Sequence, residues 1–197
     1  FLTKWTVPEL FYCSFPYSLN SIEEAKKIRT RLFNKQKILF SKDECESIIS
    51  YNNTNIKNWT MGDRKYNSQP INYSLETKWL FDKLKDFVER ETNIEIRTIK
   101  KTIHFHKFTK GDWLGKHNDV RDDRIYAVGV LLNDNFEGGD FKLHNPNEII
   151  LNKVVGNAYL FDVRIYHEIT PILEGNRYSL LWFLQNEHIK IETNKLI

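Results

Sequence analysis

The segment RIYAVGVLLNDNFEGGDFKL, residues 124–143, indicates most clearly which class of fold this chain adopts. It contains the run from Ile125 to Leu132, which has the length of a strand. The polar triplet 133–135 and the pair Gly138-Gly139 then interrupt the apolar pattern, as turn residues do, before another short apolar segment starts. Two short strands and two turns in so short a stretch indicate a β structure with frequent chain reversals.

The same alternation of short strands and turns continues on both sides of this stretch. Strands are predicted at Arg97–Phe108, Trp113–Lys116, Arg124–Leu132, Asp140–Leu143, Glu148–Leu151, Asn157–Phe161 and Arg177–Leu184. Turn residues separate them at 110–112, 133–135, 138–139, 145–147 and 174–176. Many short strands with frequent turns predict a closed or double-sheet β architecture, either a barrel or a jelly roll.

Helix signals dominate the first half of the chain. Capping boxes at Ser21–Glu24 and Ser41–Glu44 each precede apolar residues at helical spacing. The basic stretch Lys26–Lys37 is also expected to be helical, with its charges facing solvent. A third helix is predicted from about Leu75 to Glu91. The polar stretch Lys57–Ser74, between the second and third helices, is predicted to be a long loop.

Length and composition fit one folded domain. The chain has 197 residues, of which 41% are hydrophobic and 28% are charged, and this balance can bury a core. We expect a single domain over 1–197, with mainly helical support and a lid loop in 1–96, a β core in 97–185 and a C-terminal tail in 186–197. The predicted fold class is α+β, mainly β, with supporting N-terminal helices.

Charge, hydropathy and cysteine content exclude several classes of protein. A net charge of +3 is small for a non-specific nucleic-acid binder. No apolar run approaches the roughly 18 residues that a membrane helix needs. Residues 1–20 show no secretory signal, so a cytoplasmic location is expected. Cys13 and Cys45 are too few for a disulfide framework or a thiolate metal cluster, which favours a reducing compartment.

A spaced set of residues carries metal-binding chemistry. His117-Asn118-Asp119 is a His-x-Asp motif directly after the strand predicted at 113–116, and a third candidate ligand, His167, lies much later in the chain. Two imidazoles and one carboxylate on one face of an octahedral Fe(II) leave the opposite face open. Taken alone, His-x-Asp is a weak motif that also fits a turn with two solvated residues.

The sequence around these residues resembles the Fe(II)/2-oxoglutarate-dependent dioxygenases, specifically their prolyl-4-hydroxylase-like branch. The resemblance runs from about Ile38 to Phe183 and is strongest over 104–183, where order, spacing and flanking glycines agree. The segments that carry it are Phe108–His117, Arg124–Phe141, Gly156–Phe161, Tyr166–Pro171 and Gly175–Phe183. The resemblance implies a double-stranded β-helix, a cupin-like jelly roll with helices packed on its major sheet.

The resemblance also implies roles for individual residues. It makes His117, Asp119 and His167 the ligands of Fe(II), and Arg177 the partner of the distal carboxylate of 2-oxoglutarate, which a guanidinium binds bidentately. Ser179 shares a strand face with Arg177 and is expected to donate a hydroxyl to the same carboxylate. The implied reaction consumes 2-oxoglutarate and dioxygen, releases succinate and CO2 and hydroxylates an unactivated C–H bond, with ascorbate expected to stimulate it.

Three residues bear on how closely the chain follows the family. Asp119 favours hydroxylation, because family members that halogenate carbon lack this carboxylate. Phe108 stands where many members have a tyrosine that holds 2-oxoglutarate. His106, on the same strand face as His104, is the candidate replacement, and the alternative is a strand histidine satisfied by a neighbour. Arg177 stands where the best-known members of the branch use lysine, although arginine is common elsewhere in the superfamily.

The substrate is the least determined part of the prediction. Candidate contacts are Trp59, Arg64 and Tyr66 in the predicted lid loop, and Arg121, Arg124 and Tyr126 after the metal motif. The expected substrate is a peptide, a protein or a free amino acid, hydroxylated as prolyl or lysyl hydroxylases do. The alternatives are the same chemistry on a nucleobase or another small metabolite, and a non-catalytic metal-binding barrel. Other divalent metals also fit these ligands.

Overall fold

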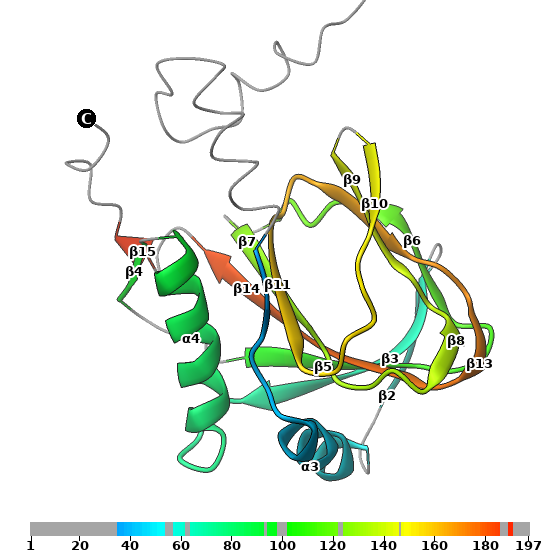
Figure 1. Ribbon diagram of the computed structural model, residues 1–197, viewed down its shortest axis with the longest axis horizontal. Coiled ribbons are helices and arrows are strands. Elements are labelled where there is room, and N and C mark those ends of the chain that lie inside the picture. The colour runs from blue at the N-terminus through cyan, green and yellow to red at the C-terminus, as the bar shows by residue number, and fades with distance from the viewer. Residues whose placement is uncertain are drawn as a thin grey trace, which may run out of the picture.

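A large antiparallel sheet forms most of the computed structural model, which describes residues 35–53, 57–61, 64–92, 94–97, 102–121, 124–145, 147–185 and 189–190 (Figure 1). In order across the sheet, the strands are β1 (Gln36–Ile38), β11 (Asn157–Asp162), β7 (Arg124–Leu131), β14 (Arg177–Gln185), β5 (Thr102–Phe108), β3 (Arg64–Asn72), β6 (Trp113–His117), β12 (Tyr166–Ile169), β9 (Phe141–Asn145) and β10 (Asn147–Ile150). Strand β2 (Lys57–Met61) pairs with β3 outside this order. Two small ladders join β13 (Ile172–Gly175) to β8 (Phe136–Gly138), and β15 (Ile189–Lys190) to β4 (Glu95–Ile96).

Strand β3 carries the sheet from one layer into the other. Its residues 67–72 pair with β5, whereas Arg64 and Lys65 pair with β6. The sheet therefore curls round on itself, with β1-β11-β7-β14-β5-β3 as one layer and β6-β12-β9-β10 as the other (Figure 1). This architecture is a double-stranded β-helix, and it confirms the predicted fold.

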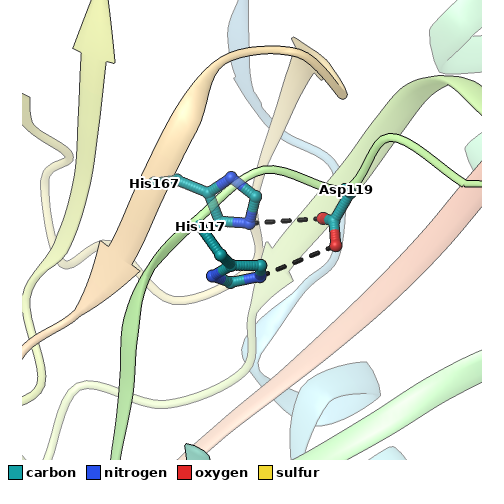
Figure 2. Close-up of side chains that lie close together, drawn as sticks. All are labelled: His117, Asp119 and His167. Atoms are coloured by element: carbon teal, nitrogen blue, oxygen red, sulfur yellow. Dashed lines mark ion pairs between the residues drawn. The ribbon is translucent and has the colours of Figure 1, made fainter. Parts of the chain in front are cut away.

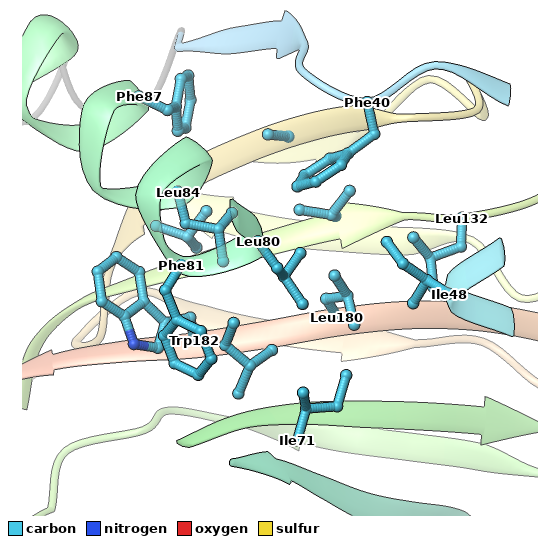
Figure 3. Close-up of a cluster of buried hydrophobic side chains, with 14 of the residues drawn as sticks. Phe40, Ile48, Ile71, Leu80, Phe81, Leu84, Phe87, Leu132, Leu180 and Trp182 are labelled. Carbon is cyan, nitrogen blue, oxygen red and sulfur yellow. The ribbon is translucent and has the colours of Figure 1, made fainter. Parts of the chain in front are cut away.

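Strand alternation produces two separate hydrophobic cores. On β14, Tyr178, Leu180, Trp182 and Leu184 pack toward the helices, in what we call the helix-side core (Figure 3). Phe183 of the same strand packs between the two layers of the sheet, in what we call the barrel core. Successive side chains of a strand point to opposite faces, so one strand supplies both cores.

Two helices cover the outer face of the larger layer, as Figure 1 shows. Helix α3 (Lys42–Asn52) starts at a complete capping box, in which the Ser41 and Glu44 side chains each accept a hydrogen bond from the other's backbone N–H. Helix α4 (Lys78–Thr92) buries an apolar stripe of Leu80, Phe81, Leu84, Phe87 and Val88. Both helices confirm the sequence prediction, and Lys83 of α4 is linked to Glu44 at 2.5 Å.

The prediction of a long loop over Lys57–Ser74 is wrong. The chain instead forms the β2–β3 hairpin, and β3 is an interior strand of the sheet. The sequence conceals this strand because most of its residues are polar and Pro70 interrupts it, while Ile71 is its only side chain in the helix-side core. Backbone hydrogen bonds to the strands on both sides stabilise β3, although its amino-acid composition is not typical of a strand.

Smaller differences from the prediction concern chain ends and short strands. The last residues of the basic stretch expected to be helical form strand β1 at 36–38, paired with β11. The helix predicted from Ser21 lies outside the described residues. The predicted C-terminal tail contributes β15, and His167 lies within β12. Whether the chain is one domain with the expected boundaries stays a prediction.

Two further expectations concern the membrane and the cysteines. Among the helices of the described ranges, none has the length and apolarity to cross a membrane. Cys45 packs in the helix-side core, where burial raises the pKa of its thiol to about 11. This thiol stays protonated and contributes packing, whereas Cys13 lies outside the described residues.

Candidate metal and co-substrate site

Two histidines and one aspartate converge between the layers of the sheet (Figure 2). His117 ends β6 and stands directly opposite His167 of β12, with ring centroids 4.3 Å apart. Asp119 follows two residues after β6, where its backbone N–H donates to the Val163 carbonyl at 2.8 Å. Its two carboxylate oxygens lie 3.6 Å from Nε2 of His117 and 3.2 Å from Nε2 of His167. The three predicted ligands therefore come together.

The backbone fixes which ring nitrogen of each histidine carries the hydrogen. Nδ1 of His117 lies 2.7 Å from the Gly115 carbonyl oxygen, and Nδ1 of His167 lies 3.0 Å from the Ile165 carbonyl oxygen. Because a carbonyl oxygen only accepts, Nδ1 donates in both rings. Both Nε2 atoms then point at Asp119, an arrangement typical of histidines that ligate a metal.

The Asp119 carboxylate completes a donor set that fits a divalent cation. Burial acts to raise the pKa of Asp119, but the facing imidazoles of His117 and His167 outweigh it and hold that pKa well below its usual range. Its buried Oδ2 atom accepts no hydrogen bond from the described residues. Two imidazole Nε2 atoms and an ionised carboxylate that converge in this way form a donor set that suits a divalent metal ion.

A cavity of about 120 Å³ lies against these three residues. Besides them, its polar lining includes Tyr66, Ser68, His104, His106, Tyr159 and Ser179. The rings of Phe141 and Phe161 also line it and pack against His167, with centroids 5.6 and 4.9 Å from that imidazole. Apolar side chains thus pack against one of the candidate metal ligands, and polar side chains line the same cavity.

Arg177, the first residue of β14, is buried, with 2% of its surface exposed. Its guanidinium donates to the Ser179 hydroxyl at 2.8 Å and lies 5.6 Å from the centre of the Phe108 ring. In the described part of the chain, no carboxylate forms an ion pair with Arg177. A buried guanidinium without a carboxylate is a site for an anionic ligand. Arg177 does not itself line the cavity, although its partner Ser179 does.

Tyr159 is a site residue that sequence reasoning missed. It lines the cavity, and burial raises the pKa of its hydroxyl against the smaller, opposing effect of the Arg177 charge. Its ring lies over Gly129 of the neighbouring strand, where an added Cβ atom would lie 2.1 Å from the ring. The available signal was Gly129 itself, because an isolated glycine inside an apolar strand indicates the close approach of another group.

His106 lies beside the Arg177–Ser179 pair, as its strand position predicts. It stands opposite Ser179 across β5 and β14, and it lines the cavity together with His104. Burial, and then the nearby His104 and Arg177, lower the pKa of His106 to about 3. The imidazole is therefore neutral at neutral pH and offers one donor and one acceptor to a ligand.

Replacing His106 by glutamine is expected to change how stability depends on pH. Between its folded pKa of about 3 and the ordinary value of 6.5, His106 binds a proton only in the unfolded chain. Acidification through this range therefore lowers the free energy of unfolding of the wild-type protein, by up to about 1.4 kcal/mol per pH unit. Denaturant unfolding between about pH 6 and pH 4 should give a shallower slope for His106→Gln, and equal slopes would contradict the buried neutral imidazole.

Five of the six candidate substrate residues lie either at the cavity or in strands β2 and β3. Tyr66, Arg121 and Arg124 line the cavity, and the Arg124 guanidinium lies 3.8 Å from the centre of the Phe183 ring. Trp59 is opposite Tyr66 in the β2–β3 hairpin, and Arg64 is opposite Leu114 of β6. For all of these residues, contact with a substrate stays a prediction.

Tyr126 does not reach the cavity, which corrects its placement among the substrate contacts. On β7, Ala127 and Leu131 belong to the barrel core, whereas Val128 and Val130 belong to the helix-side core. Tyr126 has the same parity as Val128 and packs with the helix-side core. Proximity to the metal motif in the sequence was a poor guide, because one position along a strand reverses the direction of the side chain.

Comparison with known proteins agrees with this geometry. The family model of the 2OG-Fe(II) oxygenase superfamily matches residues 103–185, which contain the three converging ligands and Arg177. No curated protein sequence matches the chain.

Several solved structures share the fold at low sequence identity. A Trichoplax adhaerens prolyl hydroxylase, in complex with a peptide fragment of the hypoxia inducible factor oxygen degradation domain, is 17% identical with a TM-score of 0.65, over 85% of this chain and 95% of that one. A Pseudomonas putida prolyl-4-hydroxylase is 17% identical with a TM-score of 0.63, over 77% and 92%. The non-heme alpha ketoglutarate dependent epimerase SnoN from nogalamycin biosynthesis is 9% identical with a TM-score of 0.59, over 82% of each chain.

The family model covers the strands that carry the converging residues, and the prolyl hydroxylases among these structures share the fold. Residues 103–185 are therefore similar to the 2OG-Fe(II) oxygenase superfamily, and the chain has the fold that prolyl hydroxylases of this kind share.

Proposed function

We propose that this protein hydroxylates an unactivated C–H bond of a peptidyl or free amino acid, as prolyl and lysyl hydroxylases do. The observation that carries the proposal is the converging set of His117, Asp119 and His167, which faces a cavity and fits Fe(II). The carboxylate of Asp119 supports hydroxylation in particular, because it occupies the ligand position that halogenating relatives leave open for halide.

The protein's own residues would hold and orient the reactants. His117, Asp119 and His167 would hold the iron, which, when bound, supplies oxidation by dioxygen coupled to decarboxylation of 2-oxoglutarate. The Nδ1 hydrogen bonds of the two histidines keep their Nε2 atoms directed at the metal position. Arg177 and Ser179 would bind the far end of 2-oxoglutarate, and Phe141 and Phe161 would keep water away from His167.

The class of substrate is supported by two of the related structures. The Pseudomonas putida protein is a prolyl-4-hydroxylase, and the Trichoplax adhaerens prolyl hydroxylase carries a peptide. In this chain, Tyr66, Arg121 and Arg124 would contact the substrate from the rim of the cavity. The epimerase SnoN has the same fold, so a small metabolite is the competing substrate class.

The test has two stages. First, anaerobic Fe(II) and 2-oxoglutarate are added to the metal-free protein, and the visible charge-transfer band of the chelate is expected to appear. A folded, iron-loaded protein without this band would contradict the use of 2-oxoglutarate. Second, proline- and lysine-containing peptides and the free amino acids are incubated with the enzyme, 2-oxoglutarate, dioxygen and ascorbate. We expect succinate release matched by the gain of one oxygen atom, whereas turnover only with non-amino-acid metabolites would overturn the substrate class.

A further inference from the structure

We propose that Tyr159 is a co-substrate-binding residue, whose hydroxyl donates a hydrogen bond to the distal carboxylate of 2-oxoglutarate beside Ser179 and Arg177. The inference rests on the proposed use of 2-oxoglutarate and adds to it a third side chain, from a different strand. Arg177 and Ser179 both belong to β14, whereas Tyr159 belongs to β11, on the far side of β7.

The first support is the direction of the hydrogen bonds around Arg177. A guanidinium has donors only, so the Ser179 hydroxyl must accept the 2.8 Å bond from Arg177. The Tyr159 hydroxyl is near enough for the Arg177 charge to act on its pKa, and any hydrogen bond between the two groups must also be donated by Arg177. Each hydroxyl therefore keeps its own hydrogen for another acceptor. Among the described residues no carboxylate occupies that position, which suits the carboxylate of a ligand.

The second support is the position of the two hydroxyl-bearing side chains. Ser179 and Tyr159 both line the cavity that the three candidate metal ligands also line, whereas Arg177 does not line it. A 2-oxoglutarate molecule held in this cavity would therefore contact these two side chains. Its negative charge would remain next to Arg177, while Ser179 and Tyr159 supply directed donors.

The third support is how firmly the Tyr159 ring is held. Tyr159 stands opposite Gly129 in the β11–β7 ladder, and a Cβ atom at Gly129 would lie 2.1 Å from ring carbon Cε2 and 2.6 Å from the hydroxyl oxygen. The ring of Phe141 packs on Tyr159 with centroids 4.9 Å apart. A phenol seated in this way has a fixed hydroxyl, so little conformational freedom is lost when a ligand binds.

The Tyr159 hydroxyl also keeps its hydrogen under ordinary conditions. Burial raises the pKa of Tyr159, and the opposing effect of the Arg177 charge is smaller. The side chain therefore remains a neutral donor wherever the enzyme works near neutral pH.

The test compares two 2-oxo acids in one binding assay. 2-Oxoglutarate and 2-oxopentanoate have the same carbon chain, but only the first has the distal carboxylate. Both are titrated anaerobically into Fe(II)-loaded protein, and the dissociation constant is read from the charge-transfer band. Tyr159→Phe is expected to weaken the binding of 2-oxoglutarate about 10- to 100-fold, which is the effect of one hydrogen bond to a charged group. The binding of 2-oxopentanoate should be unchanged.

Tyr178→Phe is the matched control, because Tyr178 is a buried tyrosine of the helix-side core and does not line the cavity. It should bind both acids as the wild type does. Unchanged 2-oxoglutarate binding in Tyr159→Phe, or equal weakening of both acids, would overturn the inference and leave the proposed function standing. If the wild type itself forms no band with 2-oxoglutarate, the proposed function fails and the inference fails with it.

Gly129→Ala supplies a second, independent variant. The added methyl group must displace the aromatic ring at position 159, so Gly129→Ala should weaken the binding of 2-oxoglutarate in the wild-type background by a similar factor of about 10 to 100. In the Tyr159→Phe background, Gly129→Ala should weaken that binding little further, because no hydroxyl remains to be misplaced. An equal additional loss in both backgrounds would show a general distortion of the barrel and would count against the role of the hydroxyl.

Discussion

Alanine at position 119 is expected to abolish the metal-dependent properties of this protein while leaving its fold intact. Asp119 supplies the only carboxylate of the converging set, and removal of a single supporting residue around a metal site already costs about 10- to 100-fold in affinity. Loss of a direct ligand should therefore exceed roughly 100-fold. In practice, Fe(II) and 2-oxoglutarate should give no charge-transfer band, and succinate release should fall to background.

Thermal unfolding separates a ligand role from a structural role for Asp119. A metal that binds only the folded protein stabilises it by about 2.7 kcal/mol at a concentration 100 times its dissociation constant. Wild-type protein should gain this stabilisation from Fe(II) or Mn(II), and Asp119→Ala should gain none. Asp134→Ala, at an exposed turn position, is the control and should behave as wild type. Metal stabilisation that persists in Asp119→Ala would exclude Asp119 as a ligand.

The candidate metal ligands could be predicted from the sequence, because two of them form a short motif and the third belongs to the ligand set that the family resemblance implies. His117 and Asp119 form a short motif after a recognisable strand, and the resemblance supplied His167. The strands rich in branched and aromatic residues were also predictable, since apolar runs between turn residues mark them. The two described helices followed from a capping box and an apolar stripe.

The parts that escaped prediction depend on which strands become neighbours. Strand β3 is polar in sequence, and it is recognisable only by its pairing with β5 and β6. Tyr159 lines the same cavity as Ser179 because β11 and β14 both flank β7, a relation that no local pattern contains. Tyr126 was misplaced for a related reason, since the face to which a strand residue points depends on register.

Loss of the guanidinium at Arg177 should be the second large effect, and it should act on the co-substrate and not on the metal. Arg177 is buried, donates to Ser179 and has no carboxylate partner in the described ranges. Each hydrogen bond to a charged group contributes about 1.5–3 kcal/mol, so Arg177→Gln should weaken the binding of 2-oxoglutarate by about 100-fold or more. Fe(II) binding should be nearly unchanged, because no atom of Arg177 belongs to the ligand set.

Kinetics and a conservative variant sharpen this prediction. Arg177→Lys keeps the charge but loses the forked geometry, so its affinity for 2-oxoglutarate should fall between those of wild type and Arg177→Gln. The KM for 2-oxoglutarate should rise more than kcat falls, since the distal carboxylate lies away from the bond that breaks. Arg90→Gln, on the exposed end of helix α4, is the matched control. If Arg177→Gln loses Fe(II) binding and 2-oxoglutarate binding together, Arg177 acts by supporting the barrel, and the assignment of the distal carboxylate to this end of the cavity is wrong.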